Sequence, residues 1–183
     1  MNYGTPKKLV DGRYFLKITD GNSGRVILQM NKVTFLTKFD DLDDVTIKLS
    51  EESVSKIVGI DQENLAAAKI NCTEWFGKQM IEQTLDTAYT KSIQDTSMNV
   101  GKLPNVKVYN HDKTIMDSSE LVGGETCDIM LELSGIWFMK KTFGSVWRIV
   151  QVRLTKPPKK VYTDEYLFQD TEVDENDQED DYI

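Results

Sequence analysis

Residues 127–154 read CDIMLELSGIWFMKKTFGSVWRIVQVRL, and this stretch decides the fold of the 183-residue chain. Apolar and polar side chains alternate with a period of two on both sides of a short connection, which is the pattern of two half-buried strands in a hairpin. On the returning strand, Val152 and Leu154 share one face, and Trp147 and Arg153 share the other. We therefore expect a long antiparallel hairpin at the end of the folded part of the chain.

The N-terminal region repeats the same alternation. Within residues 13–19, Leu16 and Ile18 share one face, and Phe15 and Lys17 share the other. Turn-forming residues follow at 20–24, and residues 25–39 are again apolar and β-branched, so we expect these two strands to form a hairpin. The apolar set changes face within the second strand, which predicts a β-bulge near Asn31.

The middle of the chain adds a helical insertion between strands. A short strand is expected at 45–49, followed by a helix N-cap at Ser50 and a longer helical region from Asp61 to about Ser92, with Gly77 breaking or capping it. A further strand is expected at 105–109. The connections between these strands, about five in all, lack the regular strand–helix alternation of a parallel sheet. This order predicts a mainly β protein, an OB-fold-like five-stranded antiparallel barrel with an inserted helix.

The charge is divided unevenly along the chain. The net charge is −8, but residues 161–183 contain ten acidic and no basic residues, so residues 1–160 carry 20 acidic and 22 basic residues. The body is therefore slightly basic, about +2, and its composition is compatible with nucleic-acid binding. We expect a folded domain over 1–160 and a disordered acidic tail over 161–183, separated by Pro157 and Pro158.

Several classes of protein do not fit the sequence. No run of apolar residues is long enough to span a membrane, and the first ten residues lack a signal-peptide core, so we expect an intracellular protein that is not secreted. Cys72, Cys127 and His111 have no zinc-like spacing, and we expect no cofactor. Common nucleotide-binding and hydrolase motifs are missing, so we expect no enzymatic activity. The strongest enzymatic alternative is a metal-dependent nuclease that uses the acidic loop at 40–44.

Cations interleaved with aromatic side chains point instead to single-stranded nucleic acid, because cations follow the phosphates and unpaired bases stack on aromatic rings. The first strand and its neighbour supply one group of candidates, and the C-terminal hairpin supplies another. The predicted nucleic-acid-binding residues are Arg13, Phe15, Lys17, Arg25, Lys32, Lys38, Lys140, Lys141, Phe143, Trp147 and Arg153.

The block 127–138, closed by 143–152, resembles the C-terminal hairpin of a single-stranded DNA-binding family encoded by large nucleocytoplasmic DNA viruses. That family is similar to the single-stranded DNA-binding proteins of short-tailed phages. The resemblance is sharpest over 127–153 and in the tail, whereas only the order of elements agrees over 1–100. It implies an OB-fold barrel and sequence-independent binding of single-stranded DNA in viral DNA replication, recombination or repair.

The resemblance also implies a role for the end of the tail. In that family the end of the tail contacts the viral DNA polymerase and helicase-primase. When DNA is absent, the tail occupies the DNA groove or binds a partner subunit. A homodimer and a location at viral replication sites, in the host nucleus or cytoplasm, follow as expectations. The terminal residue here is Ile rather than the Phe of some members. The corresponding residues are Glu179, Asp180, Asp181, Tyr182 and Ile183.

Two alternatives remain beside the nuclease. A viral structural or capsid-associated protein could share the β-rich body, although such a protein would not need a strongly acidic tail beside a basic groove. The tail could also act only as a solubility aid.

Overall fold

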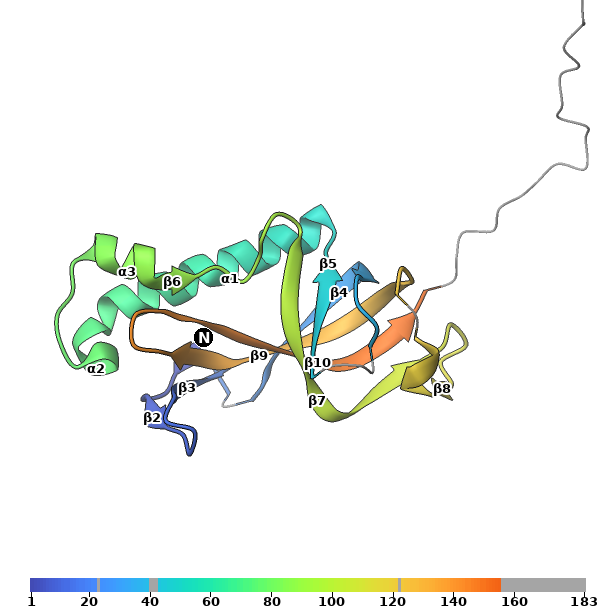
Figure 1. The fold of residues 1–183 in the computed structure, drawn as a ribbon, viewed down its shortest axis with the longest axis horizontal. Coiled ribbons are helices and arrows are strands. Elements are labelled where there is room, and N and C mark those ends of the chain that lie inside the picture. Colours follow the sequence, from blue (N-terminus) through green and yellow to red (C-terminus); the bar gives the residue numbers. More distant parts are fainter. Residues whose placement is uncertain (23, 40–42, 122, 156–183) are drawn as a thin grey trace, which may run out of the picture.

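The computed structural model describes residues 1–22, 24–39, 43–121 and 123–155. The protein is mainly β, with helices lying along one side of a long strand pair (Figure 1). The linker at 156–160 and the acidic tail at 161–183 lie outside the described residues, so the proposed domain boundary at residue 160 stays a prediction. Among the described residues, no helix is long and apolar enough to cross a membrane.

Five strands close into a ring. In the ring β4 pairs with β5, β5 with β7, β7 with β10, β10 with β9, and β9 with β4. Only the pair of β7 and β10 is parallel. In chain order this is a 1-2-3-5-4-1 barrel, the topology of an OB-fold, and it confirms the predicted fold class. The strands are β4 (Val26–Phe35), β5 (Asp44–Lys48), β7 (Ser97–Tyr109), β9 (Thr126–Phe138) and β10 (Phe143–Leu154).

The predicted C-terminal hairpin is confirmed. β9 and β10 pair from Phe138 opposite Phe143 to Cys127 opposite Leu154. The register shifts twice, so that Ser134 of β9 and Val150 of β10 have no direct partner across the hairpin. Both strands are long enough to leave the barrel and form a two-stranded extension (Figure 1).

The predicted N-terminal hairpin is wrong. β3 (Tyr14–Thr19) pairs with the second half of β9 and β4 with the first half, both antiparallel, so the two strands follow one another along the edge of β9 that β10 leaves open. The reason is the length of β9: β10 occupies one edge along residues 127–138, and the other edge is long enough to pair with both β4 and β3. The predicted bulge in β4 is confirmed by a register shift between Met30 and Val33, where Lys32 has a φ of 56°.

Short strands widen the extension. β1 (Asn2–Tyr3) and β2 (Lys7–Lys8) both pair with β3, and β6 (Tyr89–Thr90) runs parallel to the start of β10. β8 (Ile115–Met116) pairs with β7 at the barrel, and a 3-10 turn follows at Ser118–Glu120.

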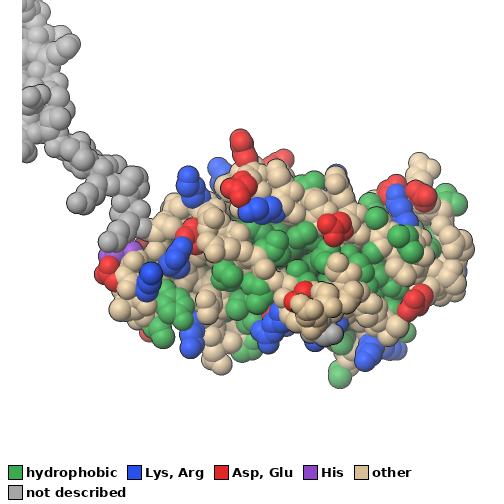
Figure 2. Space-filling view, turned by 180° about the vertical axis from the view of Figure 1, so that it is seen from behind, with side chains coloured by type: hydrophobic (Ala, Val, Ile, Leu, Met, Phe, Trp, Pro, Cys, Tyr) green, Lys and Arg blue, Asp and Glu red, His purple; other side chains and the backbone are tan. Residues whose placement is uncertain are grey.

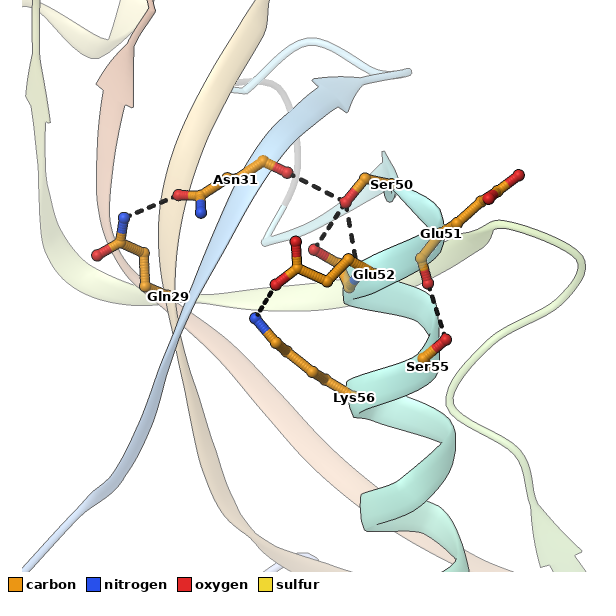
Figure 3. Close-up of polar contacts among 8 residues, drawn as sticks. Gln29, Asn31, Ser50, Glu51, Glu52, Ser55 and Lys56 are labelled. Atoms are coloured by element: carbon orange, nitrogen blue, oxygen red, sulfur yellow. Dashed lines mark hydrogen bonds and ion pairs between the residues drawn. The ribbon is translucent and has the colours of Figure 1, made fainter.

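Three helices form the insertion between β5 and β7. α1 (Glu51–Ile70) begins at the predicted N-cap, where the Ser50 hydroxyl accepts a hydrogen bond from the Ser53 amide and donates one to the Asn31 carbonyl, both at 3.4 Å (Figure 3). The cap thereby joins the helix to the bulge of β4. α1 is one continuous helix, so the helix predicted to start at Ser50 and the helical region predicted from Asp61 join without a break. α2 (Cys72–Phe76) ends at Gly77, as predicted, with a φ of 70°, and α3 (Glu82–Ala88) leads into β6.

The helices cover one face of the extension. Phe138 of β9 and Phe143 of β10 point into this interface and meet Phe76 of α2, with ring centroids 5.5 and 5.1 Å away. Cys72 and Cys127 are free thiols buried in the core. Burial raises the pKa of Cys127 to about 12, so this thiol is neutral at physiological pH.

Candidate nucleic-acid interface

A row of side chains crosses the face of the extension that points away from the helices. Lys7, Phe15, Trp137, Gly144 and Thr90 are successive register partners across β2, β3, β9, β10 and β6. Partners in register point to the same face of a sheet, and the alternate residues are buried against the helices. We call this set the Trp137 row. It confirms that Phe15 and Lys17 point away from the buried Leu16 and Ile18.

Two glycines let the aromatic rings of the row lie close to the strands. A Cβ atom on Gly135 would stand 2.6 Å from Cζ of Phe15, and one on Gly144 would stand 3.2 Å from Cζ2 of Trp137. The rings thus occupy the space above the glycines. Phe15 and Trp137 are both half-buried, and the remainder of each ring is open to solvent.

Trp137 also lines a groove of about 610 Å³. The floor comes from β5, β9 and β10, and the opposite wall comes from the segment 90–99, which connects β6 to β7. The groove exists because β10 has an open edge between its pairing with β6, which ends at Gly144, and its pairing with β7, which begins at Arg148. We call this hollow the 90–99 groove. Its floor residues are Thr46, Trp137, Ser145 and Trp147.

The groove reaches the outer face of β5 and β7, the second and third strands of the barrel. Thr46 lies opposite Asn99 in register, and its hydroxyl donates a 2.7 Å hydrogen bond to Oδ1 of Asn99. OB-folds bind oligonucleotides on this face and on the loops that follow the first and fourth strands. In this chain those loops contain Lys38 and the pair Lys140 and Lys141, all exposed.

Lysines stand along this path. Lys7 and Lys17 flank the aromatic rings of the Trp137 row, Lys91 lines the groove, and Lys48 pairs in register with the groove residue Ser97. Within the part of the chain that the structure describes, none of these four lysines forms an ion pair, and all are exposed. Lys and Arg side chains are also spread over the barrel end and along the lower edge of the opposite view (Figure 2).

Three of the predicted cations are neutralised by neighbours. Arg13 pairs with Asp11 at 2.6 Å, Arg25 with Glu132 at 3.6 Å, and Arg153 with Asp128 at 2.6 Å. Arg25 and Arg153 are paired with residues on the half of β9 that pairs with β4, rather than on the half that pairs with β3. Lys32 is exposed at the bulge of β4, and its amide donates to Asp128. Lys32 and Arg153, which both contact Asp128 near the start of β9, therefore lie apart from the Trp137 row.

Two predicted stacking residues are buried instead. Phe143 is 1% exposed and Trp147 is 4% exposed, so neither ring is available to stack on a base, and the prediction of their placement is wrong. For Trp147 the cause is the unpaired Val150: beyond this bulge the alternation follows the prediction, whereas before it the two faces are exchanged. Phe143 is the first residue of β10 rather than part of the connection, and its ring points into the core. Trp147 still lines the groove, and its indole Nε1 donates a 2.9 Å hydrogen bond to the Ser92 hydroxyl.

The acidic loop is only partly described. Asp40 and Asp41 lie outside the described residues, and Asp43 and Asp44 are exposed. In the described ranges, no group of three or more His, Cys, Asp or Glu side chains is placed to hold a metal ion. His111 lies in an exposed turn beside Asp112.

Sequence reasoning missed part of this surface. Trp137 follows the alternation of β9 only after the bulge at Ser134, so its outward position could not be read from the pattern. Lys7 belongs to a two-residue strand that is too short to predict. Lys91, Thr46 and Asn99 carry no motif, although the polar outer positions of the predicted strand at 45–49 were a usable signal for Thr46.

Comparison with known proteins gives one family match. The model of a family of unknown function (DUF5871) matches residues 31–170. No curated protein matches the chain significantly.

Similar solved structures include two that are distant in sequence. The single-stranded DNA-binding protein of bacteriophage Enc34 in complex with single-stranded DNA is 13% identical, with a TM-score of 0.47 over 85% of this chain and 96% of that chain. The single-stranded DNA-binding protein gp2.5 of bacteriophage T7 is 11% identical, with a TM-score of 0.46 over 80% of this chain and 100% of that chain. The strand pairing itself therefore carries the fold assignment.

Proposed function

We propose that this chain, which belongs to the family of unknown function (DUF5871), binds single-stranded DNA without sequence preference. The observation that carries the proposal is the continuity of the Trp137 row with the 90–99 groove on the outer face of β5 and β7. This arrangement sets two aromatic rings and four exposed lysines along one path, which runs from the extension to the face that OB-folds use for oligonucleotides.

The chemistry of the path favours a single strand over a duplex. A base can stack on Phe15 or Trp137 only when its own partner strand is absent, and each such stack contributes about 1–3 kcal/mol. The lysines attract the phosphates, which carry no sequence information. Because every base has a π face, this combination binds different sequences with similar affinity.

The first prediction tests this path. Trp137→Ala is expected to weaken binding of fluorescently labelled oligo(dT) by about 1–3 kcal/mol, roughly 5- to 150-fold, because one base loses its stacking surface. Phe15→Ala should act in the same direction. Fluorescence anisotropy at two salt concentrations measures both affinities, and the wild-type affinity should fall with salt by a logarithmic slope of about −0.7 per phosphate contact.

A matched control is available on the same strand. Tyr14 is an aromatic residue next to Phe15 that is 46% exposed but points to the opposite face of β3. Tyr14→Ala should leave the affinity unchanged. Equal wild-type affinity for duplex and single-stranded DNA, or an equal loss for Tyr14→Ala and Trp137→Ala, would refute the proposal.

The sequence resemblance supplies the biological context of the proposal. By that resemblance the protein acts in viral DNA replication, recombination or repair, inside the host cell in the nucleus or cytoplasm. Its tail, ending in Tyr182 and Ile183, recruits the viral DNA polymerase and helicase-primase, and a homodimer is part of the same picture. The support is the likeness of residues 127–153 and the composition of the tail, which contains ten acidic residues.

The second prediction concerns the acidic tail. Ten carboxylates tethered near the exposed lysines compete with phosphates at a high effective concentration. Deleting residues 164–183 is therefore expected to raise the affinity for oligo(dT), most strongly at low salt. An anisotropy titration of the full and shortened chains measures the difference. An unchanged or lower affinity at low ionic strength would leave the tail only as a solubility aid.

A further inference from the structure

One carboxylate is buried between the helical layer and the 90–99 groove. Asp61 lies in the middle of α1 and is 7% exposed. Four hydrogen bonds converge on it: from the Tyr89 hydroxyl at 2.7 Å, the Ser92 amide at 2.7 Å, the Ser92 hydroxyl at 2.6 Å and the Ser145 hydroxyl at 3.3 Å. Among the described residues, no Lys, Arg or His side chain forms an ion pair with it.

The donors to Asp61 are parts of the groove. Ser92 belongs to the wall and Ser145 to the floor. Ser92 also accepts the indole N–H of Trp147, so a chain of hydrogen bonds runs from Asp61 through Ser92 to a second floor residue. Asp61 thus holds the wall segment and the floor strand at a fixed separation.

Holding two segments together through a buried carboxylate that has no cationic partner costs free energy of folding. Burying a charge is unfavourable unless hydrogen bonds satisfy it, and an apolar side chain would fill the same space at less cost. Burial and the nearby charge of Asp61 raise the pKa of Tyr89 well above its ordinary value, which keeps the Tyr89 hydroxyl protonated as a donor. The network is therefore complete: both carboxylate oxygens accept from fixed donors.

The rest of the same helical stripe also reaches β1. Asn64, one turn further along α1, is fully buried and accepts a hydrogen bond from the Tyr3 hydroxyl at 2.9 Å. Tyr3 does not line the groove. Asn64 also donates to the Ser145 hydroxyl at 3.0 Å, so it joins β1 to the floor of the groove, whereas Asp61 is the residue of the stripe that bonds to Ser92 of the wall.

We infer that Asp61 is a positioning residue for the 90–99 groove, which sets the width of the groove through Ser92 and Ser145 without touching DNA. The inference rests on the proposed function, since the groove is the site assigned there to single-stranded DNA. It predicts that removing the Asp61 carboxylate lowers the affinity for single-stranded DNA, which is the opposite of what electrostatics alone predicts. Removing a negative charge beside a nucleic-acid site would by itself increase affinity, whereas loosening the wall decreases it.

The third prediction uses Asp61→Asn, which keeps the size of the side chain. An amide has only one acceptor oxygen. In either orientation its NH₂ group therefore faces a group that donated a hydrogen bond to the carboxylate, and that hydrogen bond is lost. We expect the affinity for labelled oligo(dT) to fall by about tenfold, the fold-change of one lost charged hydrogen bond. The slope of affinity against salt should stay at the wild-type value, because no phosphate contact is removed.

Two further variants complete the experiment. Ser92→Ala removes the hydroxyl that joins Asp61 to Trp147, and it should lower affinity without any added loss in the double variant with Asp61→Asn. Ser92→Ala also tests the inference by itself if Asp61→Asn does not fold. Tyr3→Phe is the control, because it removes a hydroxyl that bonds to Asn64 and leaves the hydrogen bonds of Asp61, Ser92 and Ser145 in place, and it should lower stability while keeping affinity within about twofold.

Each outcome has a definite meaning. Wild-type protein that binds no oligo(dT) would overturn the proposed function and this inference together. If the wild type binds, then an affinity of Asp61→Asn or Ser92→Ala equal to or above the wild-type value overturns the inference alone. Loss of affinity in Tyr3→Phe as large as in Asp61→Asn would also overturn it, because the effect would then be one of general stability.

Discussion

Phe143→Ala is expected to lower the free energy of unfolding by about 3–5 kcal/mol, the usual result of truncating a fully buried Phe. The ring is 1% exposed and sits among Phe76, Tyr89 and Phe138, with centroids 5.1, 5.2 and 6.0 Å away. The substitution removes the ring where the helical layer meets the extension, and α2 cannot move inward to fill the cavity without losing its other contacts. Urea unfolding followed by circular dichroism measures the change.

Phe15→Ala is the matched comparison for this substitution. Phe15 is half-buried on the opposite face of the same extension, so its truncation should cost far less stability and act on DNA affinity instead. If Phe143→Ala keeps the midpoint of unfolding and weakens oligo(dT) binding, then Phe143 is exposed in solution and the position of the helical layer is wrong.

Gly135→Ala is expected to destabilise the fold by about 3 kcal/mol, at the upper end of ordinary overpacking. The new Cβ would stand 2.6 Å from the Phe15 ring and nearer still to the carbonyl oxygen of Leu16. The nearest atom belongs to the backbone of β3, so relief requires β3 to separate from β9. Thermal and urea unfolding should both show the loss, and oligo(dT) affinity should fall because Phe15 loses its place.

Gly59→Ala provides the control with the opposite sign. Gly59 lies within α1, and a Cβ atom there would meet nothing within 4 Å. Alanine is favoured over glycine in a helix, so the variant should gain about 0.5–1 kcal/mol. A Gly135→Ala protein as stable as the wild type would show that β3 and β9 are not packed as closely as described.

The helical layer shows how far sequence patterns reach in this protein. Ser50 and Gly77 were predictable as caps because capping depends on neighbouring residues only. The buried stripe of α1 was not predictable, since it includes Asp61 and Asn64 as well as Ile57 and Ala68. Polar residues on a buried face break the apolar period, and their hydrogen-bond partners are distant in the sequence.

The sequence alone determined the features that depend on local alternation and composition. These are the C-terminal hairpin, the bulge in β4, the opposite faces of Leu16 and Phe15, and the division of charge between body and tail. Each follows from the two-residue period of a strand or from a count of charges. Neither kind of observation requires knowing which strand pairs with which.

Only the tertiary structure decided which aromatic rings face the solvent and which strand lies beside β3. The pattern of β10 is correct after Val150 and inverted before it, because a single bulge residue exchanges the faces of every residue on one side of it. Trp147 is therefore core, Phe143 is core because β10 begins at that residue, and the bulge at Ser134 turns Trp137 outward. The position of a bulge depends on the register of two strands, and the pairing of β3 depends on the length of β9, so both are properties of pairs of segments.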